Sequence, residues 1–501
     1  NSLALGTNSF SITGDEIDFT GGAGSVSGTG SLTLQGAAAG TTIGLGGGAG
    51  TLDLADADLA ALADGFTLLT IGRADQAGAI DVGSAGFNDA TTIRNQGGTI
   101  SITDAVTGTD GTLTFTATGI NLGSTVTTQS GAVQFNGPVT LTAASGIDTT
   151  NAGGSAGAAI GFSSTLNGTS AGAEDLDLRA GAGNITVTGA AGQTTRLGDV
   201  TVTSAAASNY AAVSAASFTQ SAGTGLTTFG GALNTDGATG VDLTGTTFTL
   251  GTVTTTGGGG VTINNSGLAT LGGAINSDGN FNQSGAGAVS LGAGVTASDA
   301  DITFNGAVTA TANSLVLNGG TGTTTLNNTL ALAANNFTIT SDEIDLAGGA
   351  GSVTGSGTIT LQNATLGASV DVGSPGGGTG VLDISDADVA ALADGFTAVQ
   401  LGRSDTGGAM NVGTLTITDR TVLRAPGSSI AFTGNVTGTG NAQLIANTAA
   451  IDLGASITTA GGLVQLNAPV TVSADVTIDT TNGGAATGGA LTIAGTVEGT
   501  T

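Results

Sequence analysis

"TTIRNQGGTISITDAVTGTDGTLTFTATGINLGSTVTTQSGAVQFNGPVTL" at Thr91–Leu141 repeats one short pattern, in which alternating apolar and polar residues are separated by Gly, Asn, Asp and Ser. Such segments are typical of β-strands between turns. The apolar positions form two sets, and each set returns after 19 to 22 residues: Ile71, Ile93, Leu113 and Val133, and then Ile80, Ile100, Ile120 and Val139. A return of about 20 residues is the scale on which β-solenoid coils repeat. We therefore predict an all-β chain whose strands stack in parallel from coil to coil.

The composition agrees with a narrow, repetitive core. The 501 residues include 92 Gly but only 3% aromatic side chains, too few for several conventional cores. Gly and Asn suit corners that need a positive φ, and Thr alternating with apolar residues places hydroxyls outward. At ~4.8 Å per coil, about 25 coils would form a rod on the order of 120 Å long. The alternative is a string of antiparallel sandwiches, which favour larger aromatic core residues and tight hairpins.

A second, longer repeat divides the chain. "NSLALGTNSFSITGDEIDFTGGAGSVSGTGSLTLQ" from Asn1 matches "NTLALAANNFTITSDEIDLAGGAGSVTGSGTITLQ" from Asn328, and the offset of 327 residues grows to 330 at Asp56 and Asp386. We predict a first solenoid module at 1–327 and a second, truncated copy at 328–501 that continues it. A copy that stops part-way is expected of a piece of a longer array.

One helix-like segment occurs in each copy. It is "DADLAALADGF" at Asp56–Phe66 in the first copy and "DADVAALADGF" at Asp386–Phe396 in the second. We predict short helical inserts near 56–65 and 386–395, with Asp56 as N-cap and Gly65 at the C-terminal end. Leu59, Leu62 and Phe66 share one face by their spacing. Because a helix this short is marginal alone, we expect that face to dock on the solenoid.

The charge balance excludes two classes of partner. The net charge is −29, from 36 acidic residues against seven Arg, with no Lys and no His. Binding nucleic acid or an anionic membrane needs a basic stripe, which seven scattered Arg do not supply. No apolar run is long enough to insert into a membrane. The absence of Cys excludes disulfides and thiolate metal sites.

The style of the repeats resembles a known family. The segments that carry the resemblance are "GSVSGTGSLTLQ", "GAVSLGAGVTASDADITFNGAVTATANSLVLNGG" and "GLVQLNAPVTVSADVTIDTTN". They resemble the repeat region of large bacterial surface exoproteins of the filamentous-haemagglutinin type and of autotransporter passengers. The resemblance implies a right-handed parallel β-helix with about 20-residue coils, an extracellular or bacterial cell-surface location and an adhesive role. The "Asn-Pro-Asn" signatures of that family's secretion domain are absent, so the export route stays open.

Two acidic turns suggest calcium. "GGAGTLDLADAD" at Gly47–Asp58 and "GGTGVLDISDAD" at Gly377–Asp388 resemble the Gly-Gly-x-Gly-x-Asp turn of calcium-binding β-rolls, with one additional residue before the first Asp. Oxygen-rich turns suit Ca²⁺. An ordinary Gly-rich turn is the alternative, because the matches are imperfect and isolated. The candidate calcium ligands are Asp53, Asp56, Asp58, Asp383, Asp386 and Asp388.

The other polar clusters favour structure over catalysis. A polysaccharide hydrolase needs carboxylates that converge on one groove. The densest acidic groups lie around Asp15, Asp53, Glu174 and Asp342, and several of them are repeat copies of each other, which indicates a structural feature duplicated with its fold. We expect "GRADQ" and "GRSDT" to form local ion pairs between Arg73 and Asp75 and between Arg403 and Asp405 rather than a site for acidic glycans.

These observations favour a secreted structural or adhesive rod of a bacterial cell-surface fibre, filament or matrix, and not an enzyme. The expected partners are identical or related surface proteins, through end-to-end or lateral assembly, and glycans of a host or a neighbouring cell. No cofactor other than calcium is suggested. A polysaccharide-active β-helix enzyme and a calcium-dependent surface-layer component are the two alternatives.

Overall fold

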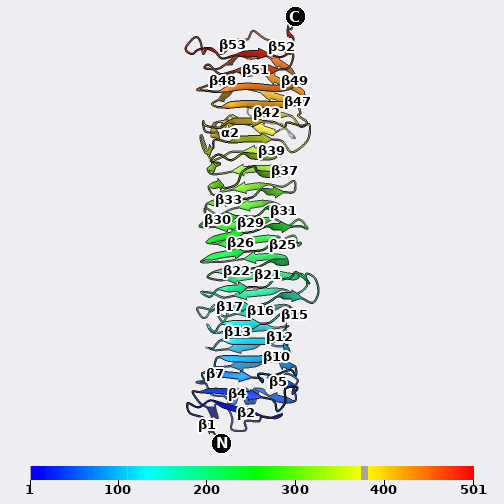
Figure 1. The fold of residues 1–501 in the computed structure, drawn as a ribbon, viewed down its shortest axis with the longest axis vertical. Helices are drawn as coiled ribbons and strands as arrows, with labels where there is room; N and C mark the ends of the chain where they lie inside the picture. The colour runs from blue at the N-terminus through cyan, green and yellow to red at the C-terminus, as the bar shows by residue number, and fades with distance from the viewer. Residues whose placement is uncertain (1, 110, 374–381, 501) are drawn as a thin grey trace. The chain divides into compact units, whose positions relative to one another are not determined.

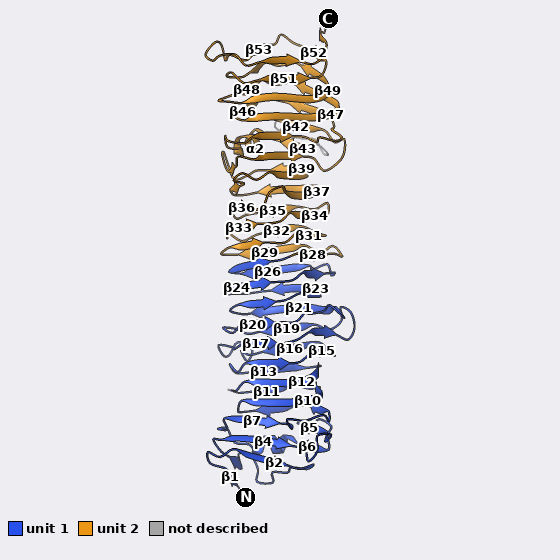
Figure 2. Ribbon diagram, viewed as in Figure 1, with its two compact units in different colours: residues 1–251 blue, residues 252–501 orange. Residues whose placement is uncertain are grey.

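The protein is a β-solenoid of parallel stacked coils, with about 22 turns, half of its residues in strands and 2% in helices. The structure, a computed structural model, describes residues 2–109, 111–373 and 382–500. Two compact units, residues 1–251 and 252–501, are coloured separately in Figure 2. The predicted all-β solenoid with short helical inserts is therefore confirmed. The repeat border after residue 327 does not coincide with the border between the units and stays a prediction from the sequence.

Unit 1 is built from three parallel ladders, which Figure 1 shows as strands lying one above another. The first ladder contains β7 (Leu68–Ile71), β10 (Thr91–Ile102), β12 (Leu113–Leu122), β14 (Val133–Asn136), β17 (Ile160–Phe162), β20 (Ile185–Val187), β22 (Ser208–Tyr210), β24 (Leu226–Phe229) and β27 (Thr247–Leu250). The second contains β8 (Ile80–Val82), the ends of β10 and β12, β15 (Val139–Leu141) and β18 (Leu166–Gly168). The third contains β9 (Ala85–Phe87), β11 (Val106–Gly108), β13 (Thr125–Thr128), β16 (Ser145–Asp148), β19 (Leu176–Arg179), β21 (Leu197–Ser204), β23 (Val213–Gln220) and β26 (Val241–Gly245).

Unit 2 repeats this arrangement. A continuous parallel ladder contains β37 (Leu315–Leu326), β39 (Phe337–Asp345), β41 (Thr358–Gln362), β44 (Ala398–Leu401), β47 (Arg420–Phe432), β49 (Gln443–Leu453) and β51 (Val464–Asn467). A second face contains β30 (Ala269–Leu271), β33 (Val289–Leu291), β36 (Val308–Ala310), β38 (Leu330–Ala331) and β40 (Val353–Thr354). A separate ladder contains β46 (Leu415–Ile417), β48 (Val436–Gly438), β50 (Ile457–Thr458) and β53 (Ile478–Asp479).

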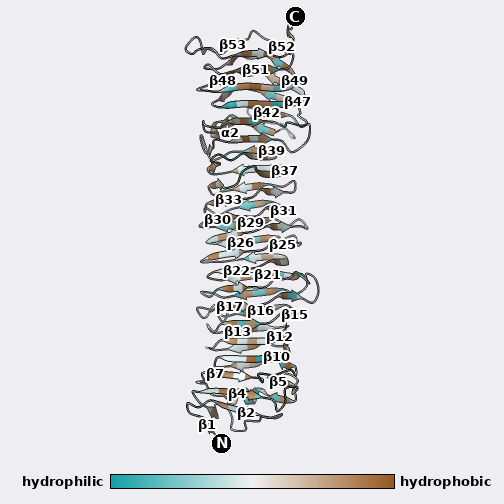
Figure 3. Cartoon of the chain, in the orientation of Figure 1, coloured by the Kyte–Doolittle hydropathy of each residue, from teal (hydrophilic) through white to brown (hydrophobic). Residues whose placement is uncertain are grey.

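The strand register follows the apolar period of the sequence. Ile80 pairs with Ile100, Ile100 with Ile120 and Ile120 with Val139, as the 20-residue spacing predicts. These side chains are almost fully buried, so each coil places the same kind of side chain above the last one. Figure 3 shows the resulting alternation of hydrophobic and hydrophilic positions along the strands.

Aromatic rings of successive coils stack along the core. Phe115, Phe135 and Phe162 occupy one position of successive coils, with ring centroids 5.3 and 4.9 Å apart and interplanar angles of 13°. All three side chains are no more than 1% exposed. Offset stacking of this kind adds to the burial of the rings.

Three lengthened coils explain why the chain makes about 22 turns and not the expected 25. Leu34 of β4 (Ser31–Gln35) pairs with Ile71, so one coil includes the whole of residues 35–70. Leu361 pairs with Leu401 in the same way, and Phe135 pairs with Phe162. In the first of these coils the additional residues include β6 (Leu52–Leu54), which extends the second ladder by pairing with β5 (Ile43–Leu45).

Buried amide side chains bind the corners of several coils. Gln283 is fully buried, and its Nε2 donates to Oδ1 of Asn265 and to the carbonyl oxygen of Gly285, both at 2.7 Å. Its Oε1 accepts the backbone N–H groups of Asn305 (3.0 Å) and Gly306 (2.8 Å). The sequence analysis did not identify these amides, which add hydrogen bonds to backbone groups at the bends.

Candidate functional site

The helical inserts lie where the sequence predicts them, but they are shorter. Helix α1 spans Asp56–Ala61 and α2 spans Asp386–Ala391. The predicted ends at residues 65 and 395 are wrong because Leu62 leaves the helical conformation, with ψ of 114°, and forms a parallel bridge to Val26. Ala63 then donates its N–H to the carbonyl oxygen of Val26 at 2.8 Å. The helix thus ends where the chain rejoins the coil.

The N-cap assignment is also corrected. The N-cap residues are Ala55 and Ser385, and Asp56 and Asp386 are the first helical residues. Ser385 accepts the N–H of Asp388 at 3.3 Å through its hydroxyl, while Oδ2 of Asp388 accepts the N–H of Ser385 at 2.9 Å. This reciprocal pair is a capping box, in which an acidic third residue satisfies the N-cap amide.

Asp58 and Asp388 fasten the inserts to the solenoid. Oδ1 of Asp58 accepts the N–H of Phe19 at 2.7 Å, and its Oδ2 accepts the N–H of Ala55 at 3.1 Å. In the second copy, Oδ1 of Asp388 accepts the N–H of Leu346 at 2.7 Å. Both carboxylates are buried. Each one therefore joins the helix start to a segment about 40 residues earlier in the chain.

The apolar face of α1 docks as expected. Leu59, Leu62 and Phe66 are 6%, 6% and 5% exposed, and α1 packs against β9. In the second copy, α2 packs against β46, and Leu392 and Phe396 are buried. The inserts are thus packed parts of their coils.

The structure places the candidate calcium ligands in the two short helices and in the strands just before them. Asp53 is an exposed residue of β6 (Leu52–Leu54), Asp56 is exposed at the start of α1, and both oxygens of Asp58 already accept backbone N–H groups. Asp383, in β43 (Leu382–Ile384), and Asp386 and Asp388 occupy the same positions in the second copy. Residues 377–381 of the second turn lie outside the described residues. Within the described ranges, no three acidic side chains are grouped as a metal ion would require, and calcium binding stays a prediction.

One carboxyl group of the second copy has a strongly raised pKa. Burial raises the pKa of Glu343 to about 7, and the negative charges of Asp383, Asp388 and Asp345 act in the same direction. Glu16, the residue at the corresponding position of the first copy, is exposed.

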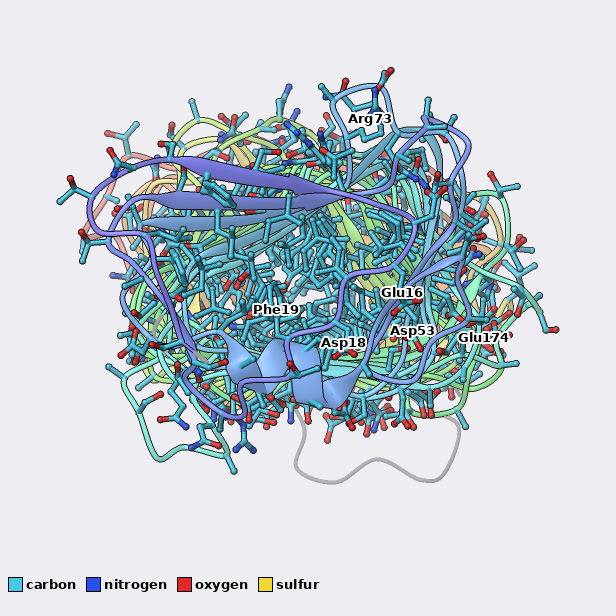
Figure 4. The ribbon with its side chains drawn as sticks, turned by 90° about the horizontal axis from the view of Figure 1, so that it is seen from below. Glu16, Asp18, Phe19, Asp53, Arg73 and Glu174 are labelled. Carbon is cyan, nitrogen blue, oxygen red and sulfur yellow. The ribbon has the colours of Figure 1, made fainter. Side chains whose placement is uncertain are left out.

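The two predicted Arg–Asp ion pairs form, on a different side of the coil from α1. Nε of Arg73 lies 2.8 Å from Oδ1 of Asp75, and in the second copy a nitrogen of Arg403 lies 2.7 Å from Oδ2 of Asp405. Figure 4 shows Arg73 across the section of the solenoid from Asp18 and Asp53. The basic and acidic clusters do not converge on one site.

A shallow hollow of about 350 Å³ lies on the outer face of β13, β16, β19 and β21. Its rim carries side chains at matching positions of successive coils, because Thr125 aligns with Gly146 and Gly146 with Asp177. Gly146 adds no side chain, which leaves room between Thr125 and Asp177. Arg179 also lines the hollow, and its guanidinium makes no ion pair with another described residue.

Comparison of the chain with protein-family models, with curated proteins and with solved structures gave no match. The resemblance to haemagglutinin-type surface proteins therefore stays a prediction from the repeats. Among the described residues, no helix has the length and apolar character needed to cross a membrane.

The hydrogen bonds of Asp58 predict a structural effect that is independent of calcium. Asp58→Ala removes the acceptor for two backbone N–H groups, so we expect a loss of about 2 kcal/mol in the free energy of unfolding. Asp56→Ala is the matched control, because Asp56 is exposed and its loss should cost well under about 1 kcal/mol. Urea unfolding in chelator and in millimolar calcium measures both. A loss for Asp58→Ala that appears only in calcium would instead indicate a metal ligand.

The burial of Glu343 predicts that the free energy of unfolding falls as the pH rises. Because the folded-state pKa lies above the ordinary value, the protonated form stabilises the fold at low pH, and this contribution is lost as the pH rises through about 7. We expect Glu343→Gln to raise the melting temperature relative to the parent at about pH 8 and to change it little at about pH 4. Measurements in chelator exclude bound cations. Glu16→Gln is the control, and an equal effect of both variants would contradict the assignment.

Proposed function

We propose that this chain is a secreted structural and adhesive segment of a bacterial cell-surface fibre, filament or matrix, and that it acts through non-covalent contacts. The observation that carries the proposal is the regular outer face of the ladders. Polar side chains at equivalent positions project from successive strands about 4.8 Å apart, as Thr127, Asp148 and Arg179 do. A surface with such a repeat suits an extended, repetitive partner.

Glycans of a host or a neighbouring cell fit the polar hollow of unit 1. Thr and Asp side chains exchange hydrogen bonds with sugar hydroxyls, and the guanidinium of Arg179 is a donor for hydroxyl or acetamido oxygens. Both carboxylate oxygens of Asp148 already accept hydrogen bonds within the chain. Oδ1 accepts the N–H and the hydroxyl of Thr150 at 2.7 Å, and Oδ2 accepts the N–H of Ala152 at 2.8 Å. It thereby orders the insert that follows β16, which supports a preformed contact surface.

Contacts with identical or related surface proteins are the second part of the proposal. The net charge of −29 opposes close lateral packing of bare copies at low ionic strength. Lateral assembly is therefore expected to increase with salt or with divalent cations. Assembly that also needs calcium would favour the surface-layer alternative.

Binding of the chain to an array of neutral glycans tests the adhesive role. We expect Arg179→Ala to reduce binding to the glycans that the parent selects by about tenfold, as for loss of a hydrogen bond from a charged donor. Arg196→Ala is the matched control in the same unit, because Nε of Arg196 already pairs with Asp236 at 3.1 Å.

Two results would contradict this function. No glycan binding by the parent, or an equal loss with both Arg variants, would exclude the hollow as the contact site. Release of shorter saccharides from the bound glycan would replace the adhesive function by the polysaccharide-active enzyme.

A further inference from the structure

A cavity of about 440 Å³ lies between α2 and the strands β44, β46 and β47 of unit 2. Its volume falls within the range of about 300–1,000 Å³ that is usual for small-molecule sites. The cavity belongs to none of the sites described above, apart from Asp386, which is at its rim.

The residues that line the cavity divide into an exposed mouth and a buried, largely apolar floor. The exposed residues of the mouth are Asp386, Ala390, Thr414 and Thr416. The floor consists of buried side chains, namely Leu392, Val399, Leu401, Ile417, Asp419 and Thr421. An apolar site with a few convergent polar groups is the usual form of a ligand pocket.

Three of the corresponding positions of the first copy carry larger side chains. At an offset of 330 residues, Val389 is replaced by Leu59, Val399 by Leu69 and Ile417 by Phe87. These three residues of the first copy are buried, at 6%, 4% and 3% exposure. The smaller side chains at these three positions of the second copy therefore leave more space between the helix and the strands.

Asp419 gives the floor its chemical character. The residue is 2% exposed, and its Oδ1 accepts the N–H of Gly395 at 3.0 Å. Its Oδ2 is buried and accepts no hydrogen bond of normal geometry from the described residues, although the N–H of Phe396 and the side chain of Asp394 lie close enough to the carboxyl group to affect its pKa. Burial raises the pKa of Asp419, and the negative charge of nearby Asp394 adds to this effect. A buried carboxylate without a full set of donors favours a ligand that supplies one.

Among the described residues, no arginine lines the cavity as a partner for the Asp419 carboxylate. Arg420 follows Asp419 directly, but it is exposed and does not line the cavity. Asp386 at the mouth adds a second negative charge. The negative charges at the mouth and in the floor of the cavity therefore favour a positively charged ligand.

We propose that this cavity binds a small molecule with an apolar body and one ammonium group. The apolar body contacts Leu392, Val399 and Ile417, and the ammonium group donates hydrogen bonds to the carboxylate of Asp419. This site is separate from the glycan contact of unit 1 and does not depend on it.

Hexylammonium is a suitable probe, with 1-hexanol and hexanoate as neutral and anionic controls of the same length. Calorimetric titration of the full chain should give saturable, one-to-one binding of hexylammonium, weaker binding of 1-hexanol and none of hexanoate. Asp419→Asn should lower the hexylammonium affinity about tenfold and leave the hexanol affinity nearly unchanged.

A triple variant separates the cavity from the general attraction of cations to an acidic protein. Val389→Leu with Val399→Leu and Ile417→Phe copies the side chains of the first repeat, so it should fold, and it keeps the net charge. We expect it to lose hexylammonium binding while its melting temperature stays near that of the parent. Unchanged binding in the triple variant, or equal affinities for all three probes, would overturn the proposal. So would a parent chain that shows no saturable binding.

Discussion

The parallel backbone ladder in register from one coil to the next is the constraint on which the rest of this structure depends. In a parallel ladder every strand must present the same face inward at the same position, because a shift by one residue would turn its apolar side chains outward. The alignment of Ile80, Ile100, Ile120 and Val139 meets this condition. The same alignment places the outward-facing residues in rows. One sequence repeat therefore determines both the buried core and the outer surface of the coils.

The same constraint decides where the chain can depart from its period. The additional residues lie between paired strands of one ladder, and the chain must return to register after them. The return after α1 is visible in the bridge between Leu62 and Val26, and Asp58 holds the helix start through the N–H of Phe19. The inserts consequently have fixed positions, and one of them, α2, covers a cavity in unit 2. Departures from the period are thus where the sites specific to each copy arise.

Much of the fold could be predicted because the apolar period is local and strong. The strands around Ile100 and Ile120 follow from the spacing of the apolar residues, and the start of both helices was predicted to within one residue. The end of α1 could not, since it depends on Val26, a residue distant in sequence. Gln283 was missed because a buried amide has no periodic signal, and its role appears only when the corners of two coils lie together. The cavity under α2 was missed for a similar reason: the exchange of Phe87 for Ile417 is visible in the repeat, but the space it leaves is not.

Cysteine pairing across one coil tests the register most directly, because the chain contains no Cys of its own. Thr114 of β12 pairs with Gln134 of β14, and both side chains are outside the buried core. Aligned positions on neighbouring parallel strands are ~4.8 Å apart, within the range that a disulfide spans. Thr114→Cys with Gln134→Cys should therefore cross-link on mild oxidation, whereas Thr114→Cys with Asn136→Cys, two residues out of register, should not. Cross-linking of the second pair in preference to the first would contradict the parallel, in-register solenoid.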